Sequence, residues 1–173
     1  MSKAFTKEND EGAGLDSTAS ILPRTAAGET RYLTPEGAGG LRAELARLSE
    51  ERSIMRVGDA RSDPPRAREI ERRLQKVTEI LDSAAVAPVE ADAAGRVLFG
   101  AWVAIEDEEG ARRTYRIVGP DEADARERRI SASSPFGRAL IGRKAGDQVT
   151  VELPRGISTI TLLSVSSEEP PGP

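Results

Sequence analysis

The chain has 173 residues, of which 38% are hydrophobic and 31% are charged, and its formal net charge is −4. These values are typical of a soluble protein with one ordinary domain or two small ones. It contains neither cysteine nor histidine, which excludes disulfides, thiolate zinc sites and catalysis by a thiol or an imidazole.

Other broad classes are disfavoured by how the residues are distributed. The chain has no long block of one charge sign, so binding nucleic acid through phosphates is not its expected primary role. It has no apolar run near the ~20 residues of a membrane span and no secretory signal at its start. We therefore expect a cytoplasmic protein with no membrane partner, no intrinsic cofactor, no catalytic residue and no small-molecule substrate.

Residues 1–30 are rich in small and charged side chains and predict a disordered tail. A helix start follows, because Thr34 is a good N-cap and Pro35 suits the first helical position. Gly37 weakens that first turn. An amphipathic helix to about residue 57 is indicated by apolar residues at helical spacing, namely Leu41, Leu45, Leu48 and Met55.

A break at residues 58–65 separates this helix from a second one. Gly58 is a natural C-cap, and Ser62 or Asp63 can cap the next helix ahead of two prolines. The second helix has an apolar seam formed by Ile70, Leu74, Val77 and Leu81. Two amphipathic helices joined by a short turn predict an antiparallel helical hairpin, a short coiled coil, over residues 31–87.

After a linker at residues 88–95 the apolar period changes to two. Five residues share one face of a predicted strand: Val97, Phe99, Ala101, Val103 and Ile105. Further strands are predicted at 112–118, 128–133, 149–153 and 160–162, with a brief helix at 134–141 and a frayed end at 167–173. The sequence therefore predicts an α+β protein, in which the hairpin precedes a small antiparallel β domain at residues 96–166.

Several strings in both halves carry a family resemblance. The second half contains FGAWV at 99–103, RIVGPDE at 116–122, SPFGRALIG at 134–142 and GDQV at 146–149. The first half contains LTPEG at 33–37 and EIERR at 69–73. In this order they make the chain similar to the Gre-type (GreA/GreB) bacterial transcription elongation factors.

That resemblance implies a partner and a separate role for each of the two domains. The family's C-terminal domain is FKBP-like and docks at the rim of the RNA polymerase secondary channel. Its hairpin enters the channel, where acidic tip residues help to hold a catalytic Mg²⁺ while the polymerase cleaves its own backtracked transcript. The resemblance assigns partner binding to residues of two strings: Ser134, Pro135, Arg138, Leu140, Gly142 and Asp147.

The hairpin tip departs from the family pattern. Asp59 matches the first tip acid, but Ser62 stands where the second is expected, and Asp63 lies one residue later. Only nine residues separate Asp59 from Glu69, fewer than the family usually places there. Each missing residue withdraws a helix tip by about 1.5 Å, so a carboxylate would fall short of the metal. This shape is similar to the short-hairpin Rnk-type regulators of nucleoside diphosphate kinase.

We therefore expect a polymerase-binding regulator without standard cleavage stimulation. Asp59 and Asp63 are candidates for assisting Mg²⁺ shared with the polymerase, or are ordinary turn and N-cap residues. Contact with nascent RNA or DNA is a candidate role for Arg61, Arg66 and Arg68.

Three alternatives remain at this point. The arginines near the turn also fit a solvated face with local pairs such as Glu69 with Arg73. The whole protein could be a cleavage-stimulating factor that uses Asp59. It could also be an FKBP-like prolyl isomerase or a general interaction adaptor, although fold analogy alone assigns neither activity. Trp102 is expected in the core rather than at a contact surface.

Overall fold

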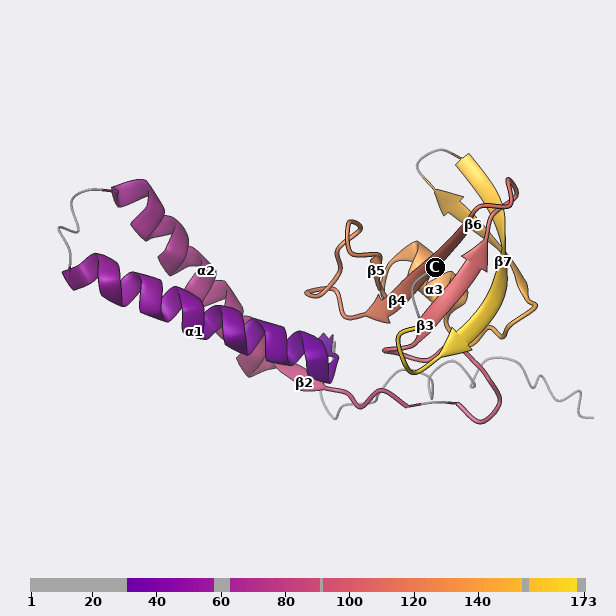
Figure 1. The fold of residues 1–173 in the computed structure, drawn as a ribbon, viewed down its shortest axis with the longest axis horizontal. Coiled ribbons are helices and arrows are strands. Elements are labelled where there is room, and N and C mark those ends of the chain that lie inside the picture. The colour runs from indigo at the N-terminus through magenta and orange to yellow at the C-terminus, as the bar shows by residue number, and fades with distance from the viewer. Residues whose placement is uncertain (1–30, 58–62, 91, 154–155, 171–173) are drawn as a thin grey trace, which may run out of the picture.

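The computed structural model describes residues 31–57, 63–90, 92–153 and 156–170. A long helical hairpin forms one part of the molecule, and a curled sheet with one short helix forms the other (Figure 1). The hairpin consists of helix α1, Pro35–Val57, and helix α2, Pro64–Ser83. The α+β class and both predicted helices are confirmed. The predicted tail at 1–30 lies outside the described residues.

Apolar side chains from both helices fill the interior of the hairpin. The buried set is Ala38, Leu41, Leu48, Ile70, Leu74, Val77 and Ile80. The predicted seam is wrong at its last position, because Ile80 is buried while Leu81 is only partly buried. The reason is a tertiary contact: at this end α2 packs against Leu33, which lies just before α1, as well as against α1 itself.

A short parallel strand pair closes the base of the hairpin. Strand β1, Arg31–Leu33, pairs with β2, Ala84–Val86, so the chain enters and leaves the hairpin side by side. The pairing continues through the Ala87 N–H, which donates to the Leu33 carbonyl at 2.9 Å. We did not predict this pair, because three residues are too few to show a period of two.

The C-terminal part is a five-stranded sheet with the order β5-β4-β3-β7-β6. Its elements are β3 Trp102–Glu106, β4 Arg112–Val118, β5 Arg129–Ser131, α3 Pro135–Leu140, β6 Gln148–Leu153 and β7 Gly156–Ser166. Neighbouring strands are antiparallel except for β4 and β5, which are parallel. The expectation of a purely antiparallel domain is therefore wrong at this edge, where residues 119–128 carry the chain back to the start of β5.

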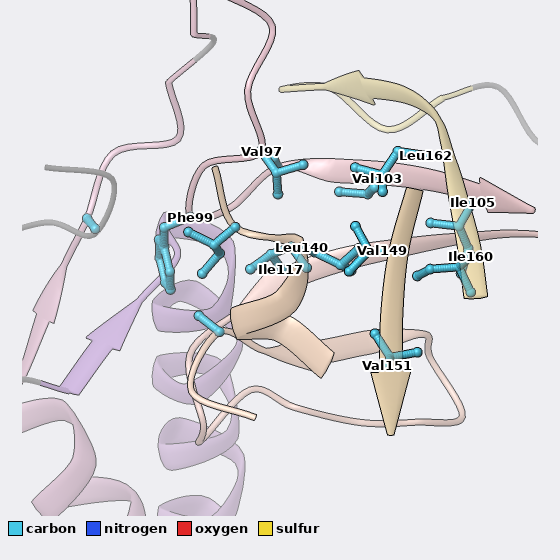
Figure 2. Close-up of a cluster of buried hydrophobic side chains, with 14 residues drawn as sticks. Val97, Phe99, Val103, Ile105, Ile117, Leu140, Val149, Val151, Ile160 and Leu162 are labelled. Carbon is cyan, nitrogen blue, oxygen red and sulfur yellow. The ribbon is translucent and has the colours of Figure 1, made fainter. Parts of the chain in front are cut away.

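Fourteen buried residues form the core of the β domain, and Figure 2 shows how their side chains converge between the sheet and α3. Val97, Phe99 and Ala101 belong to this core, but they do not belong to a strand as predicted. The chain turns before Ala101, whose N–H donates to the Leu98 carbonyl at 3.2 Å, with Gly100 at a φ of 83°. Alternating burial therefore extends beyond the hydrogen-bonded strand, which begins only at Trp102.

Within the described ranges, neither α1, α2 nor α3 is long and apolar enough to cross a membrane.

Candidate partner-binding surface

Ser134 sets the corner at which β5 leads into α3. Its hydroxyl accepts a hydrogen bond from the Gly137 N–H at 3.0 Å and donates to the Ser131 carbonyl at 2.7 Å. Pro135 occupies the first helical turn, where the lack of an N–H costs nothing. A Cβ on Gly137 would lie 2.1 Å from the Ser131 carbonyl oxygen, so the corner requires glycine.

Two of the six predicted partner-binding residues are freely exposed, namely Pro135 and Arg138. Arg138 is held near the surface of α3 by a hydrogen bond from its guanidinium to the Ser133 carbonyl. Leu140, by contrast, is fully buried in the core of the β domain. Its side chain supports α3 from below and presents no surface that a partner could contact in this structure.

Gly142 and Asp147 shape the turns that follow α3. Gly142 has a φ of 80°, a left-handed conformation that glycine adopts without steric cost, and its N–H donates to Val97. The Asp147 carboxylate accepts from the Lys144 N–H at 2.9 Å. Both residues are therefore engaged in building the loop and are half-buried, whereas Pro135 and Arg138 are the freely exposed part of the predicted set.

A groove of about 720 Å³ lies beside Arg138 and was not predicted from the sequence. One wall comes from the base of the hairpin, including Arg31 and Tyr32, and the other from the β domain, including Phe99 and Pro120. Its lining is largely apolar and includes three charged side chains, Arg31, Glu79 and Arg138. This volume is within the range of clefts that bind small molecules.

The hairpin tip is only partly described. Asp59 and Arg61 lie outside the described residues. Asp63 is the N-cap of α2, and its carboxylate accepts the Arg66 N–H at 3.0 Å. The Arg66 side chain pairs with Glu51 of α1 at 2.7 and 2.9 Å, whereas Arg68 is exposed. The capping interpretation of Asp63 therefore has direct geometric support.

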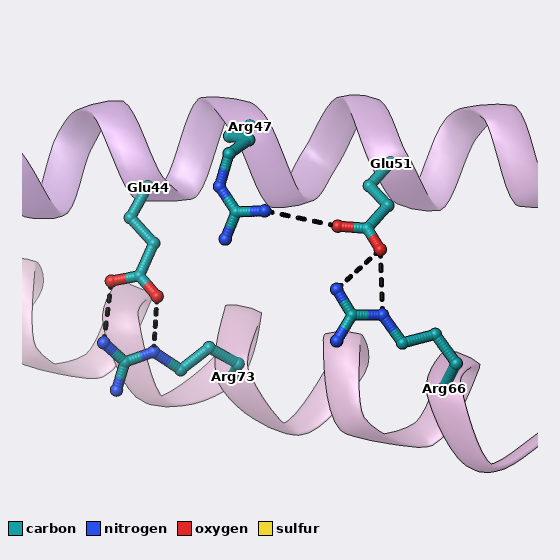
Figure 3. Close-up of polar contacts among 5 residues, drawn as sticks. All are labelled: Glu44, Arg47, Glu51, Arg66 and Arg73. Carbon is teal, nitrogen blue, oxygen red and sulfur yellow. Dashed lines mark hydrogen bonds and ion pairs between the residues drawn. The ribbon is translucent and has the colours of Figure 1, made fainter.

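Ion pairs run along one side of the hairpin and link its two helices (Figure 3). The Arg73 guanidinium donates two hydrogen bonds to the Glu44 carboxylate at 2.6 and 2.7 Å. These bonds lower the pKa of Glu44 and raise that of Arg73. The expected local pair of Glu69 with Arg73 is not formed: Glu69 instead pairs with Arg72 at 3.0 Å. Pairing across the helices is favoured because it is bidentate and partly buried.

The described residues offer no ready-made metal centre. Within the described ranges, no group of three or more His, Cys, Asp or Glu side chains is placed to hold an ion. Asp63, the described candidate, is already a hydrogen-bond acceptor for its own helix. The described residues therefore do not fit an intrinsic metal site.

Aromatic side chains in the β domain pack mainly against other groups of the protein. Tyr115 and Phe136 form an edge-to-face pair with ring centroids 5.6 Å apart. Trp102 is partly buried, and the Arg116 guanidinium lies 5.4 Å from its ring centroid. Phe99 is the one β-domain aromatic that lines the groove, where it meets Tyr32 from the hairpin base.

Comparison with known proteins gives a consistent result. The family model described as "Transcription elongation factor, GreA/GreB, C-term" matches residues 91–167. Transcription elongation factor GreB of Pseudomonas aeruginosa is 38% identical over 166 residues, covering 87% of this chain and 96% of that protein. GreA of Thioalkalivibrio sulfidiphilus is 41% identical over 150 residues, covering 77% of this chain and 95% of that protein.

Solved structures of similar proteins include a GreA/GreB elongation factor from Nitrosomonas europaea. It is 20% identical, covers 80% of this chain and 99% of its own, and has a TM-score of 0.40.

Proposed function

The chain belongs to the GreA/GreB family of transcription elongation factors, and we propose that it binds bacterial RNA polymerase in the cytoplasm, at the secondary channel. In this proposal the β domain docks, the hairpin partly occupies the channel, and the polymerase supplies all of the chemistry. In this proposal the factor contributes no catalytic residue of its own. An FKBP-like character of the β domain also remains a prediction from the resemblance.

Docking through the α3 corner is supported by the accessibility of Arg138 and Pro135. Arg138 also faces the groove between the hairpin base and the β domain. Arg31, on the hairpin side, is paired with Glu79 at 3.6 Å and with Asp121 at 3.5 Å, so Arg138 supplies the positive charge in this proposal. An apolar groove with the positive charge of Arg138 beside it suits a partner segment that carries an apolar side chain and an acidic one. Leu140 contributes only by holding α3 in place.

Binding to purified core polymerase tests this surface. Arg138→Glu should weaken binding by tenfold or more, since it turns an attractive charge at the rim into a repulsive one. Arg112→Glu is the matched control, because Arg112 is exposed on β4 and does not line the groove. Absence of binding by the parent protein at micromolar concentration would reject the proposed partner. Equal binding by Arg138→Glu would reject the docking surface.

We further propose that the hairpin acts without standard stimulation of transcript cleavage. The observation that carries this proposal is the capping role of Asp63, whose carboxylate is committed to the Arg66 N–H at 3.0 Å. A carboxylate that coordinates Mg²⁺ must present its oxygens at about 2.0–2.1 Å, so Asp63 would have to give up its cap. Only Asp59 is then left as a matched tip acid, and any Mg²⁺ would have to be held largely by the polymerase.

A stalled, backtracked elongation complex tests this mode of action. Addition of the protein with Mg²⁺ should leave the transcript length unchanged over the time in which a cleavage-active family member shortens it. Rapid shortening that is lost in Asp59→Ala would instead establish the cleavage-stimulating alternative. Asp63→Asn is the companion variant, because asparagine keeps the cap while removing the charge.

The isomerase alternative requires an aromatic-lined pocket that strips water from a prolyl peptide. The groove lined by Phe99 and Tyr32 is a candidate, but the hairpin base forms one of its walls. Turnover of a prolyl tetrapeptide by the protein would favour the isomerase. Contact of Arg66 and Arg68 with nascent RNA or DNA remains a prediction, and crosslinking in the elongation complex would test it.

A further inference from the structure

Thr34 and Glu122 join the hairpin to the β domain through two buried hydrogen bonds. The Thr34 N–H and hydroxyl donate to the two carboxylate oxygens of Glu122 at 2.7 and 2.5 Å. The same hydroxyl accepts from the Gly37 N–H at 3.0 Å, which makes Thr34 the N-cap of α1. Thr34 is fully buried and Glu122 is 8% exposed. Glu122 therefore completes a helix cap from the other part of the molecule.

The charge of Glu122 suits this position. The N-terminus of a helix carries a partial positive charge and unpaired N–H groups, and a carboxylate placed there is stabilised. Since Glu122 and Thr34 are buried at the junction, a change in the hairpin direction would break both hydrogen bonds at once. The contact therefore opposes rotation as well as separation of the two parts.

Two glycines let the parts approach closely. A Cβ on Gly37 would lie 1.8 Å from Oε2 of Glu122, and a Cβ on Gly119 would lie 1.9 Å from the Tyr32 carbonyl oxygen. One glycine thus belongs to the hairpin and the other to the β domain. Beside them the Tyr32 and Phe99 rings meet with centroids 6.0 Å apart. The absence of two side chains is what allows the buried contact to form.

Two ion pairs flank the junction. The Arg116 guanidinium, from β4, donates to the carboxylate of Glu36 in the first turn of α1. Arg31 of β1 lies 3.5 Å from the Asp121 carboxylate. Together with the central contact they connect the hairpin base to the β domain at three separate points. Several contacts between the two parts restrain their relative orientation more than a single contact would.

We propose that Glu122 is a positioning residue that sets the direction of the hairpin relative to the β domain. The β domain would then aim the hairpin as it docks, because the two parts move as one body. That consequence for polymerase rests on the proposed function. The fixed direction itself is a property of the free protein and is tested first on the free protein.

Distance measurement between two spin labels tests the proposal. The chain contains no cysteine, so labels can be attached specifically to Thr78→Cys on α2 and Thr150→Cys on β6, both exposed positions. The parent protein should give a single narrow distance distribution. Glu122→Ala should replace it with a broad or multiple one, while Glu122→Gln, which keeps an acceptor oxygen, should retain most of the narrow component.

Controls separate a change in direction from unfolding. Glu109→Ala removes an exposed glutamate on the far turn between β3 and β4 and should leave the distribution narrow. Gly37→Ala perturbs the same carboxylate from the hairpin side and should also broaden it. Circular dichroism establishes that each variant keeps its helices. A narrow, unshifted distribution in both folded Glu122→Ala and folded Gly37→Ala would overturn the proposal.

A second experiment measures binding to core polymerase and the effect on elongation. Glu122→Ala should bind it with an affinity close to that of the parent but lose the parent's effect on elongation. If the parent does not bind, the proposed function fails while the distance result stands. If Glu122→Ala binds and acts as the parent does, the channel aims the hairpin, and the consequence of Glu122 for polymerase is rejected.

Discussion

The Glu122 carboxylate fills the space beside Gly37 that a side chain there would need: a Cβ on Gly37 would lie 1.8 Å from the Oε2 atom of Glu122. Replacing glycine by alanine inside a helix normally stabilises it by about 0.5–1 kcal/mol. Here the new methyl group must push the carboxylate away from Thr34. We expect Gly37→Ala to lower the free energy of unfolding by about 1–3 kcal/mol, the cost of unsatisfied buried hydrogen-bonding groups. Urea denaturation measures the change.

Gly40→Ala should have the opposite sign. Gly40 is exposed in the same helix, and a Cβ there would meet nothing within 4 Å. Gly40→Ala should therefore raise the free energy of unfolding by the full amount usual for this substitution in a helix, about 0.5–1 kcal/mol. In a Glu122→Ala background, Gly37→Ala should also become neutral or stabilising, because the obstructing carboxylate is gone. If Gly37→Ala still lowers the free energy of unfolding in that background, the Glu122 carboxylate is not the cause of the loss.

Local chemistry was sufficient to predict several elements of this fold. The strand at Arg112–Val118 and the helix corner at Ser134 depend on neighbouring residues, and both are found as predicted. The strand pair β1–β2 was missed because its two segments are three residues long and far apart in sequence. No periodic signal can be read from three residues, so only the closed hairpin brings them together.

Contacts between residues far apart in sequence also limited what could be predicted at the junction and at the candidate surface. The strings around Thr34 and Glu122 were both recognised, but the two residues are 88 positions apart and nothing local indicates that they meet. Gly37 was read as a weakness of the first turn, whereas it makes room for a carboxylate. Leu140 was grouped with Arg138 because they share a string, and only three-dimensional packing separates the buried residue from the exposed one.

The pair of Glu44 with Arg73 should contribute more than a typical exposed pair. Its bidentate hydrogen bonds at 2.6 and 2.7 Å connect the two helices and are partly buried. We expect a double-mutant cycle of Glu44→Gln and Arg73→Gln to give a coupling energy near the upper end of the range of about 0.2–1 kcal/mol. Glu69 and Arg72, an exposed pair within α2, should give a smaller value. Equal coupling in the two cycles would contradict this ranking.

Asp92 should make stability depend on pH in the acid range. The Arg96 guanidinium donates to its carboxylate at 2.7 Å and lowers the pKa of Asp92 to about 2. The ordinary value for an unfolded chain is about 3.9. Because the folded pKa is depressed, this contribution to stability is present above pH ~4 and is lost as the pH falls toward 2.

Denaturant midpoints at several pH values measure that contribution. The difference in midpoint between the parent and Asp92→Asn should be largest near neutral pH and should shrink between pH ~4 and ~2. In an Arg96→Ala background the same substitution should show a much weaker dependence on pH. A difference that stays constant over this interval would mean that the hydrogen bond does not shift the titration.

Arg128 adopts a backbone conformation that favours glycine, with a φ of 56° just before β5. A left-handed conformation costs a residue with a Cβ roughly 1–2 kcal/mol, whereas glycine reaches it freely. Part of that gain is offset by the greater freedom of glycine in the unfolded chain, so Arg128→Gly should raise the unfolding free energy by about 0.5–1 kcal/mol.

Arg126→Gly is the matched control in the same loop and should instead be destabilising, since Arg126 has no positive φ. The Arg128 carbonyl accepts the Arg116 N–H at 3.0 Å, so a stable loop here also supports the strand that carries Arg116 to the junction. A loss of stability in Arg128→Gly equal to that in Arg126→Gly would show that the side chain of Arg128 outweighs its backbone strain.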